Sequence, residues 1–471
     1  MTKKIIISII AGSLLFAGAG CKKFLNVNDD PSGAEKVNDG LLLTGVEMTT
    51  AFSISGGYPA RTSTFWTQQL AYNQPAPDWD TYSSTSSDVN NTWAFDMYPA
   101  ILKNLKVLEA QANEAGHKHF EGVAKIMIAY NLAVTTDVWN DVPYSEGFQG
   151  FGKLTPKYDS QKDIYASINT LLDDAITLLS AADNTVVPDA KDLIYGGKAS
   201  KWVSFAYFLK ARYALRLCYA PGNVTTTQAQ AALTAIDKAF PDESGNAFVQ
   251  FATGAGAESP WYQFIQNWGS VVTSKTFIDF LQGKNDPRLP LVAEPLDDGS
   301  FVGRKIGITA TSPSGTVSEV GAAFSAADMK INLGTYDEQL FIKAEATFLT
   351  AGAAAAQPIL KQAVEATMKR FGLDAASAEV QAYITANCTI TPANAYATIM
   401  YEKYIANFQT LEAFNDWRRT NLPALTPVAN AYLNLTTIPR RWVYPASENA
   451  TNKQPQQPGL LTGRVWWDTK Q

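Results

Sequence analysis

The 471 residues include 38 lysines and arginines against 44 aspartates and glutamates, which gives a formal net charge of −6. This acidic balance disfavours a nucleic-acid partner, because surfaces that bind phosphates carry excess positive charge. Hydrophobic residues make up 46% of the sequence, yet beyond residue 20 no apolar run reaches the roughly 18 residues that a membrane-spanning helix needs. We therefore expect a mature chain that does not cross a membrane.

Residues 1–20 resemble a secretory signal peptide. Two lysines precede an apolar stretch at 5–16, and small residues at 17–20 lead to Cys21. The sequence Gly18-Ala19-Gly20-Cys21 is similar to the lipobox of bacterial lipoproteins, in which the cysteine is acylated, although a Leu-like residue usually stands where this chain has Gly18. We predict a cleaved signal peptide, a lipidated Cys21 and a polar tether at 21–38. The alternatives are an ordinary secretory signal with an incidental cysteine, or an uncleaved anchor.

Hydrophobic residues spaced three and four apart predict amphipathic helices along most of the remaining chain. The clearest stripes are Tyr98, Ile101, Leu105 and Leu108, then Phe120, Val123, Met127 and Tyr130, then the apolar residues of 164–179 and 202–213. Later pairs are expected at 336–351 with 358–371, and within 395–417. Successive helices of this kind bury their apolar faces only against their neighbours, so the pattern favours a mainly α-helical chain built from tetratricopeptide-like helix pairs.

A loop-rich insertion at about 241–335 interrupts the helical pattern. This segment is rich in Gly, Ser, Thr, Asp and aromatic residues, and the segments 79–91 and 439–471 have a similar composition. Long irregular segments on a rigid scaffold are where binding residues gather. We predict one helical domain at 39–471 with its ligand-binding region in these loops.

Two aromatic stretches have the composition of a sugar-binding site. Sugar rings present apolar C–H faces edged by hydroxyls, so they bind to Trp or Tyr rings flanked by hydrogen-bonding side chains. The two stretches are 65–82 and 261–268, and the predicted ligand-binding residues are Trp79, Asp78, Tyr72, Tyr82, Trp261 and Trp268. Trp79 is the first choice for the ring that contacts the ligand, because it follows two prolines and stands between aspartates. Aromatic residues are also ordinary core residues, as helical spacing indicates for Trp66 and Leu70.

No catalytic or metal-binding motif stands out. His117 and His119 have no nearby cysteine or third histidine, which favours a solvated turn over a metal site. The two cysteines beyond Cys21 are too few for a disulfide framework, and Cys218 ends an apolar helical stripe. We expect no cofactor and no metal. Glycoside hydrolysis needs two carboxylates about 5 to 9 Å apart. Sequence spacing alone does not exclude Asp78 with Asp80, or Asp137 with Asp141, as such a pair.

Several short motifs resemble the SusD/RagB family of outer-membrane nutrient-binding lipoproteins of Bacteroidetes, in the order in which that family carries them. They are Cys21-Lys-Lys-Phe-Leu, Val138-Trp-Asn-Asp-Val-Pro-Tyr144, Ala199-Ser-Lys-Trp202, Asn285-Asp-Pro-Arg-Leu289, Phe341-Ile-Lys-Ala-Glu-Ala346, Tyr401-Glu-Lys-Tyr404 and Glu412-Ala-Phe-Asn-Asp-Trp-Arg-Arg-Thr420. Most of these motifs have a structural explanation. The prolines set turns, and paired charges such as Glu402, Glu412, Arg418 and Arg419 are expected to brace helix packing.

The resemblance implies a function. Members of this family lie on the outer face of the outer membrane, anchored by lipid, and act as a lid on a SusC-like TonB-dependent barrel. They are not enzymes, and they deliver glycans or, in the RagB branch, peptides. The hypothesis is therefore a SusD-like, non-catalytic capture protein for an oligomeric nutrient, most simply a glycan. A peptide-binding RagB-like protein, a helical-repeat scaffold and a glycoside hydrolase are the alternatives.

Overall fold

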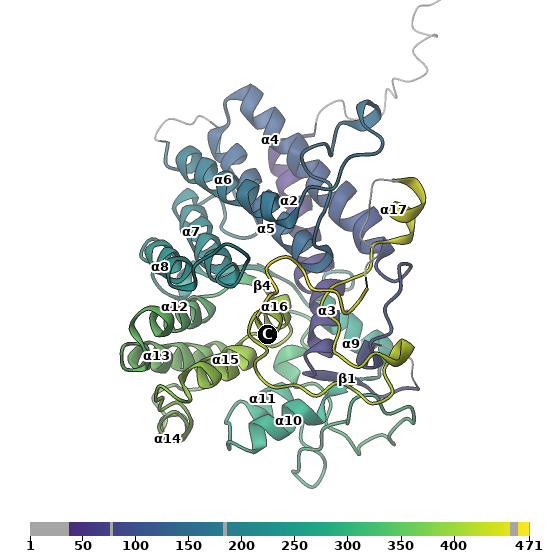
Figure 1. Ribbon diagram of the computed structural model, residues 1–471, viewed down its shortest axis with the longest axis vertical. Coiled ribbons are helices and arrows are strands. Elements are labelled where there is room, and N and C mark those ends of the chain that lie inside the picture. The colour runs from purple at the N-terminus through teal and green to yellow at the C-terminus, as the bar shows by residue number, and fades with distance from the viewer. Residues whose placement is uncertain (1–36, 76–78, 182–185, 453–459, 471) are drawn as a thin grey trace, which may run out of the picture. The chain divides into compact units, whose positions relative to one another are not determined.

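Helix pairs follow one another along one side of the unit formed by Asp39–Gln471. The computed structural model describes residues 37–75, 79–181, 186–452 and 460–470, so the predicted signal peptide, tether, Cys21 and Asp78 lie outside the described residues. The paired helices are α4 (Lys103–Ala115), α5 (Lys118–Trp139), α6 (Gln161–Leu179), α7 (Ala199–Arg216), α8 (Thr225–Ile236), α12 (Tyr336–Ala351), α13 (Ala353–Phe371), α14 (Ala378–Asn387), α15 (Ala395–Ala406) and α16 (Leu411–Thr420). Figure 1 shows α6 to α8 continuing into α12 to α15 on this side. The predicted mainly helical fold is confirmed.

Helix α6 illustrates why these segments are helical. Its predicted stripe is buried, from Ile164 and Ile168 to Leu179. The hydroxyl of Ser160 accepts a hydrogen bond from the Asp163 backbone N–H at 3.2 Å, which satisfies one of the free donors of the first turn. Helix α5 packs on α6, and α12 packs on both α8 and α13. The stack therefore buries each apolar stripe against the next helix.

Buried ion pairs join the helices in addition to apolar contacts. Arg212 of α7 pairs with Glu338 of α12 at 2.7 Å, and Arg419 of α16 pairs with Glu345 of α12 at 2.5 Å. Arg288 lies within 2.6 Å of both Asp286 and Glu402, and all three side chains are fully buried. The prediction that the charged motifs brace packing is confirmed. Removal of one partner would leave an uncompensated buried charge.

The strands are few and short, as the sequence predicts. Strand β1 (Leu70–Tyr72) pairs antiparallel with β3 (Val271–Thr273), so that Leu70 lies opposite Thr273 and Tyr72 opposite Val271. Strand β2 (Ala247–Gln250) pairs antiparallel with β4 (Lys330–Gly334). Each two-stranded sheet joins segments that are far apart in the sequence.

The segment 241–335 is more regular than its composition suggests. It contains α9 (Pro260–Trp268), α10 (Lys275–Gln282), α11 (Leu289–Val292) and two short 3-10 turns, η6 (Glu243–Gly245) and η7 (Ala322–Phe324). Local signals explain the first two helices, since Ser259 and Ser274 cap their N-termini and Pro260 occupies the first helical position. In Figure 1 helix α9 lies near α3 and β1, whereas η6 and η7 contact the last turn of α13, through Glu243 with Lys369 and Phe324 with Phe371.

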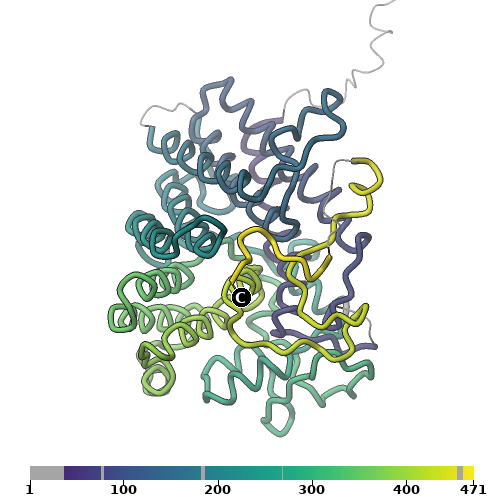
Figure 2. The backbone as a smooth tube through the Cα atoms, in the orientation of Figure 1, coloured from purple at the N-terminus to yellow at the C-terminus, as the bar shows by residue number. Residues whose placement is uncertain are grey.

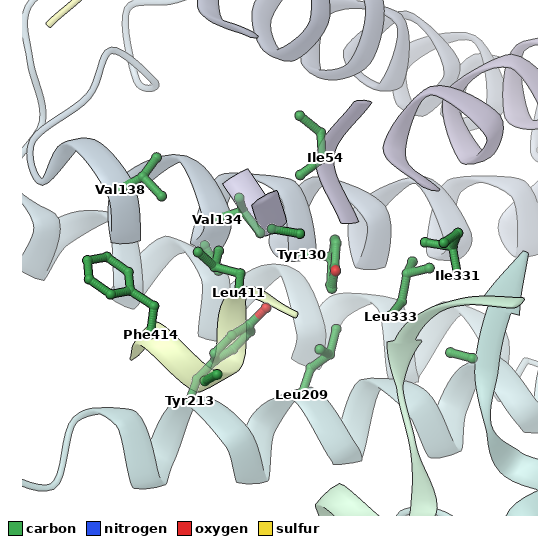
Figure 3. Close-up of a cluster of buried hydrophobic side chains, with 14 of the residues drawn as sticks. Ile54, Tyr130, Val134, Val138, Leu209, Tyr213, Ile331, Leu333, Leu411 and Phe414 are labelled. Carbon is green, nitrogen blue, oxygen red and sulfur yellow. The ribbon is translucent and has the colours of Figure 1, made fainter. Parts of the chain in front are cut away.

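The core fills the space between the helix stack and the remaining elements. Figure 3 shows Tyr130 and Val134 of α5, Leu209 and Tyr213 of α7, Leu333 of β4 and Leu411 of α16 pointing toward one another. The other N-terminal elements are α2 (Asp39–Thr49), the π-helix η2 (Thr50–Ser55), α3 (Tyr58–Trp66), the 3-10 turn η3 (Trp79–Thr81) and the π-helix η4 (Thr92–Leu102). Trp66 and Leu70 are both fully buried, which agrees with their helical spacing.

The C-terminal segment is extended and returns to the N-terminal half, as the tube of Figure 2 shows in yellow. The backbone N–H of Trp442 donates to the Val138 carbonyl at 2.8 Å, and the Trp139 indole N–H donates to the Val443 carbonyl at 3.0 Å. The remaining short elements are the 3-10 turns η5 (Gly150–Gly152) and η8 (Tyr432–Asn434) and the helix α17 (Ala446–Thr451). Among the helices that the structure describes, none is long and apolar enough to cross a membrane.

Candidate ligand-binding surface

The β1–β3 pairing brings the two predicted aromatic stretches together. Strand β1 leads into the segment that ends at Trp79, and β3 follows helix α9 after two residues. The ring of Phe264 in α9 stacks on the ring of Trp79, with centroids 5.8 Å apart and planes inclined by 25°. Residues almost 200 positions apart in the sequence therefore form one aromatic cluster, which we call the Trp79 cluster: Tyr58, Phe65, Tyr72, Trp79 and Phe264.

Trp79 is half-buried at the start of the 3-10 turn η3. Its ring meets Tyr58 edge-on at 4.8 Å, Phe65 at 5.6 Å and Tyr72 at 5.8 Å. These contacts fix the orientation of the indole while part of it stays open to solvent. A ring held in this way can stack on a ligand without losing rotational freedom on binding.

A half-buried cation supports the back of the cluster. The Arg61 guanidinium lies 4.4 Å from the centre of the Phe264 ring, and it donates to the Pro260 carbonyl at 2.8 Å and to the Gly56 carbonyl at 3.2 Å. Burial lowers the pKa of Arg61 to about 10, so the side chain stays charged at neutral pH. The cation–ring contact and the two carbonyl bonds hold α9 against α3.

The loop at 304–312 forms a fixed polar rim beside β1. Arg304 is buried and donates to the carbonyls of Ile308 and Ala310, at 2.9 Å each, and to the Ser312 hydroxyl at 2.8 Å. Asn73 exchanges two hydrogen bonds with Ser312, at 2.7 and 3.1 Å. Sequence composition marked this segment only as irregular, because the partners of Arg304 lie in its own loop, where no periodic spacing marks them.

The other predicted ligand-binding residues lie in different environments. Tyr72, Tyr82 and Trp261 are at most 3% exposed, so in this conformation their rings support the surface and present almost no face of their own. The Tyr82 hydroxyl accepts a hydrogen bond from the Val428 backbone N–H at 3.2 Å, and burial raises the pKa of Tyr82 to about 12. Trp268 ends helix α9, and Asp78 lies outside the described residues.

Sequence analysis missed Tyr58 and Phe264 as members of the cluster. Phe264 follows Trp261 by three residues, so helical spacing places both on one face of α9. Tyr58 begins α3 and also meets Trp442 edge-on at 5.1 Å. Its contact with Trp79 depends on tertiary packing alone.

The described aspartates considered for hydrolysis, Asp80, Asp137 and Asp141, have structural hydrogen-bond partners. Asp137 is buried, pairs with Arg216, and accepts hydrogen bonds from the Tyr165 hydroxyl at 2.6 Å and the Trp467 indole at 2.8 Å. Asp141 accepts from the Gln161 backbone N–H at 2.9 Å. Burial raises the pKa of both carboxyls. Asp80 is buried and accepts from the Gly307 backbone N–H at 3.3 Å.

The histidines contact other parts of the fold, and the cysteines beyond Cys21 are buried in it. His117 lies 2.6 Å from Asp39, and its neighbour in the motif, His119, contacts the Ala181 carbonyl at 3.3 Å. Cys218 and Cys388 are free and buried. Within the described ranges, no group of three or more His, Cys, Asp or Glu residues is arranged to hold a metal ion.

The fold and the surface define a class: a tetratricopeptide-like stack of helices that carries an aromatic surface on its loop-rich side. Residues 31–445 match the family model SusD-like_2, described as starch-binding associating with outer membrane. The chain therefore belongs to the SusD-like family, whose members are binding proteins associated with the outer membrane.

Solved structures agree with this assignment. A SusD/RagB family protein from Bacteroides thetaiotaomicron is 25% identical with a TM-score of 0.74, covering 92% of this chain and 99% of that one. A chitin-binding protein is 25% identical with a TM-score of 0.79, covering 92% and 100%. A chitin-binding SusD homolog from Flavobacterium johnsoniae shares the fold at 21% identity and a TM-score of 0.75, covering 92% and 99%. No curated protein matches the sequence.

Proposed function

We propose that this chain is a non-catalytic lipoprotein of the cell surface that captures an oligomeric glycan. It passes the glycan to a SusC-like TonB-dependent transporter of the outer membrane. The single observation that carries the proposal is Trp79, a half-exposed indole held by four other rings on the loop-rich side of a SusD-like fold. The Trp79 cluster is braced before any ligand arrives, which reduces the entropy lost on binding.

The chemistry of the surface favours a glycan over a peptide. A sugar ring presents a flat apolar face to an indole, and its hydroxyls need neutral donors and acceptors at the edge. Asn73 and Gln74 directly follow Tyr72, whose ring contacts Trp79, and Gln266 and Asn267 are exposed on α9. The chitin-binding neighbours support the same ligand class. A RagB-like peptide-binding protein is the second candidate.

The proposed site gives each predicted residue a role. Trp79 stacks on the ligand, whereas Tyr72, Tyr82 and Trp261 hold the surface from behind. Asp78 and Trp268 are proposed as contacts at its edge, because both adjoin the cluster in sequence.

Affinity measurements on a Trp79→Ala variant test the proposal. Loss of a principal aromatic anchor costs about 2 kcal/mol or more, which is at least tenfold in affinity. Isothermal titration with chitohexaose, maltohexaose and a peptide pool identifies the ligand class, and chromatography of the same mixtures reveals any cleavage. Trp66→Leu is the matched control, since Trp66 is fully buried in the same segment and offers no ring to a ligand. Unchanged affinity in Trp79→Ala would move the site elsewhere, and cleavage of a glycan would make the protein an enzyme.

Fractionation of cells tests the anchor. If Cys21 is acylated, Cys21→Ala should release the protein from membranes in cells that lack the transporter, because the described part of the chain holds no spanning helix. Retention in the outer-membrane fraction would contradict the lipid anchor. Protease treatment of intact cells should remove the wild-type protein, whereas full protection would place it in the periplasm.

Co-purification tests the transporter. A tagged chain extracted in mild detergent should bring with it a TonB-dependent barrel encoded nearby. Purification of the chain alone under these conditions would contradict the proposed partnership.

A further inference from the structure

A pocket lies on the outward face of the β2–β4 sheet, apart from the Trp79 cluster. Its volume is about 560 Å³, within the range of about 300–1,000 Å³ that is usual for small-ligand sites. The walls come from β2, β4, the turn η7 and the last turn of α13, and no residue of the Trp79 cluster contributes to them. The chief lining residues are Phe248, Asn332, Lys330, Phe324 and Phe371.

Strand alternation explains how this face is built. Val249 of β2 and Ile331 and Leu333 of β4 are buried in the core. Because side chains alternate across a strand, Phe248, Lys330 and Asn332 point to the opposite face. Phe248 lies opposite Asn332 in the register. A half-exposed phenylalanine thus stands where a solvated strand face usually carries a polar residue.

The walls are fixed by contacts within the protein. Phe324 and Phe371 meet edge to face at 4.9 Å. Arg370 is held by Asp337 at 2.8 Å and donates to the Ala406 carbonyl at 2.6 Å, so it supports the wall and has no free charge. Lys369 pairs with Glu243 at 2.8 Å at the edge of the pocket.

Other polar groups in the pocket remain available to a ligand. The Lys330 ammonium lies 4.5 Å from the centre of the Phe248 ring, and among the described residues it forms no ion pair. The Asn332 side-chain amide makes no hydrogen bond within the described ranges. Asp328 and Gln250 also line the pocket, and the Gln250 amide already donates to the Phe251 and Asp328 carbonyls. Charged groups of both signs, from Lys330 and Asp328, therefore adjoin the aromatic wall.

We infer that this pocket is a second saccharide-binding site, which holds another part of the glycan or a separate chain. The Phe248 ring offers the stacking face, and Asn332, Lys330 and Asp328 offer hydrogen bonds to hydroxyls. A purely apolar ligand would leave these polar groups desolvated, and a strongly charged one would meet both signs of charge. The inference rests on the proposed function in its ligand class, but it concerns different residues.

Hydrogen exchange measured by mass spectrometry separates the two sites. Wild type, Trp79→Ala and Phe248→Ala are each measured with chitohexaose, with maltohexaose and with a tripeptide. Protection is followed at 70–82 and at 247–250 with 330–334. We expect one of these glycans to protect the β2–β4 amides in Trp79→Ala. We expect Phe248→Ala to lower affinity at this site at least fivefold while protection at 70–82 persists. Phe95→Ala is the matched control, since Phe95 is 65% exposed on η4 and lines neither site.

The outcomes are distinct. If the glycans protect only 70–82 in the wild type, and Trp79→Ala loses that protection, the second site is overturned and the proposed function stands. Protection at β2–β4 alone would support the second site and remove Trp79 from the proposed function. Protection of the β2–β4 amides by a tripeptide but by neither glycan would overturn the saccharide assignment.

Discussion

The helix stack and the loop-rich side of this protein use different interactions to hold their elements together. In the stack, buried arginines and carboxylates join α7, α12, α15 and α16, with Arg212–Glu338 and Arg419–Glu345 as examples. On the loop-rich side, rings of the Trp79 cluster pack on one another, and Arg61 lies over one of them. Directional charge pairs fix the angle between helices, whereas an aromatic cluster can leave one ring partly open. Most of the family motifs therefore lie on helices of the stack, whereas ligand binding is proposed for the loop-rich side.

The largest expected effect breaks the charge cluster that joins α15 of the stack to the segment 241–335. Arg288→Met leaves Asp286 and Glu402 buried without their cation, and loss of one partner of a buried pair costs about 3–5 kcal/mol. Urea unfolding should show this loss. The matched control is Lys361→Met, which removes an exposed lysine 3.7 Å from Glu365 and should cost less than about 0.5 kcal/mol. A similar, small loss in both variants would show that the charge cluster contributes little to stability.

The second comparison is between two tryptophans of the loop-rich side. Trp66 is fully buried against Phe414, so Trp66→Ala should cost about 3–5 kcal/mol. Trp79 is only half-buried, and Trp79→Ala should cost about 2 kcal/mol, because part of its surface already faces water. Thermal melting of both variants measures the difference. An equal loss in the two variants would place Trp79 in the core and count against its proposed role.

The helix stack could be predicted from sequence because its signals are local. The stripe from Ile164 to Leu179 repeats at helical spacing, and the structure buries it as expected. The segment 241–335 was predicted less well. Its composition suggested loops, yet Ser259-Pro260 and Ser274 begin two helices, and these capping signals outweigh composition.

The candidate site was predictable only in part. Trp79 could be chosen from its polar neighbours, but its contact with Phe264 depends on β1 pairing with β3 across about 200 residues. Arg304 was missed for a different reason, since its carbonyl partners lie four and six residues away in an irregular loop that carries no periodic signal. Burial of Tyr82 and Trp261 likewise follows from tertiary packing and has no local signal.

A smaller effect concerns a buried carboxyl of the N-terminal helix α2, which pairs with no cation among the residues that the structure describes. Glu47 of α2 is fully buried and accepts from the Leu193 backbone N–H at 2.7 Å. Burial, together with the nearby Asp192, holds the pKa of Glu47 well above its ordinary value of 4.5. An acid whose folded pKa is raised binds more protons when folded, so the free energy of unfolding falls as pH rises above about 4.5 toward the folded-state pKa.

Glu47→Gln should therefore stabilise the protein at pH 7.5, by about 1 kcal/mol, and change little at pH 4. The amide can donate to Asp192 in place of the protonated carboxyl. Urea midpoints at the two pH values measure the effect. The same change in midpoint at both pH values would show that Glu47 stays in one protonation state over this range.

The last comparison is between one helix cap from each side. Ser377 caps α14 in the stack through a single bond from the Val380 backbone N–H at 3.3 Å, so Ser377→Ala should cost about 0.5–1 kcal/mol. Ser259 is fully buried at the start of α9, where it accepts from the Tyr262 N–H at 3.1 Å and donates to the Ala326 carbonyl at 2.9 Å. Ser259→Ala removes both bonds and should cost about 1–2 kcal/mol. Because α9 carries Phe264 behind Trp79, Ser259→Ala should also weaken glycan binding, whereas Ser377→Ala should leave the affinity unchanged. Thermal melting and glycan titration of the two variants measure stability and affinity. Equal affinities in the two variants would show that glycan binding does not depend on the position of α9.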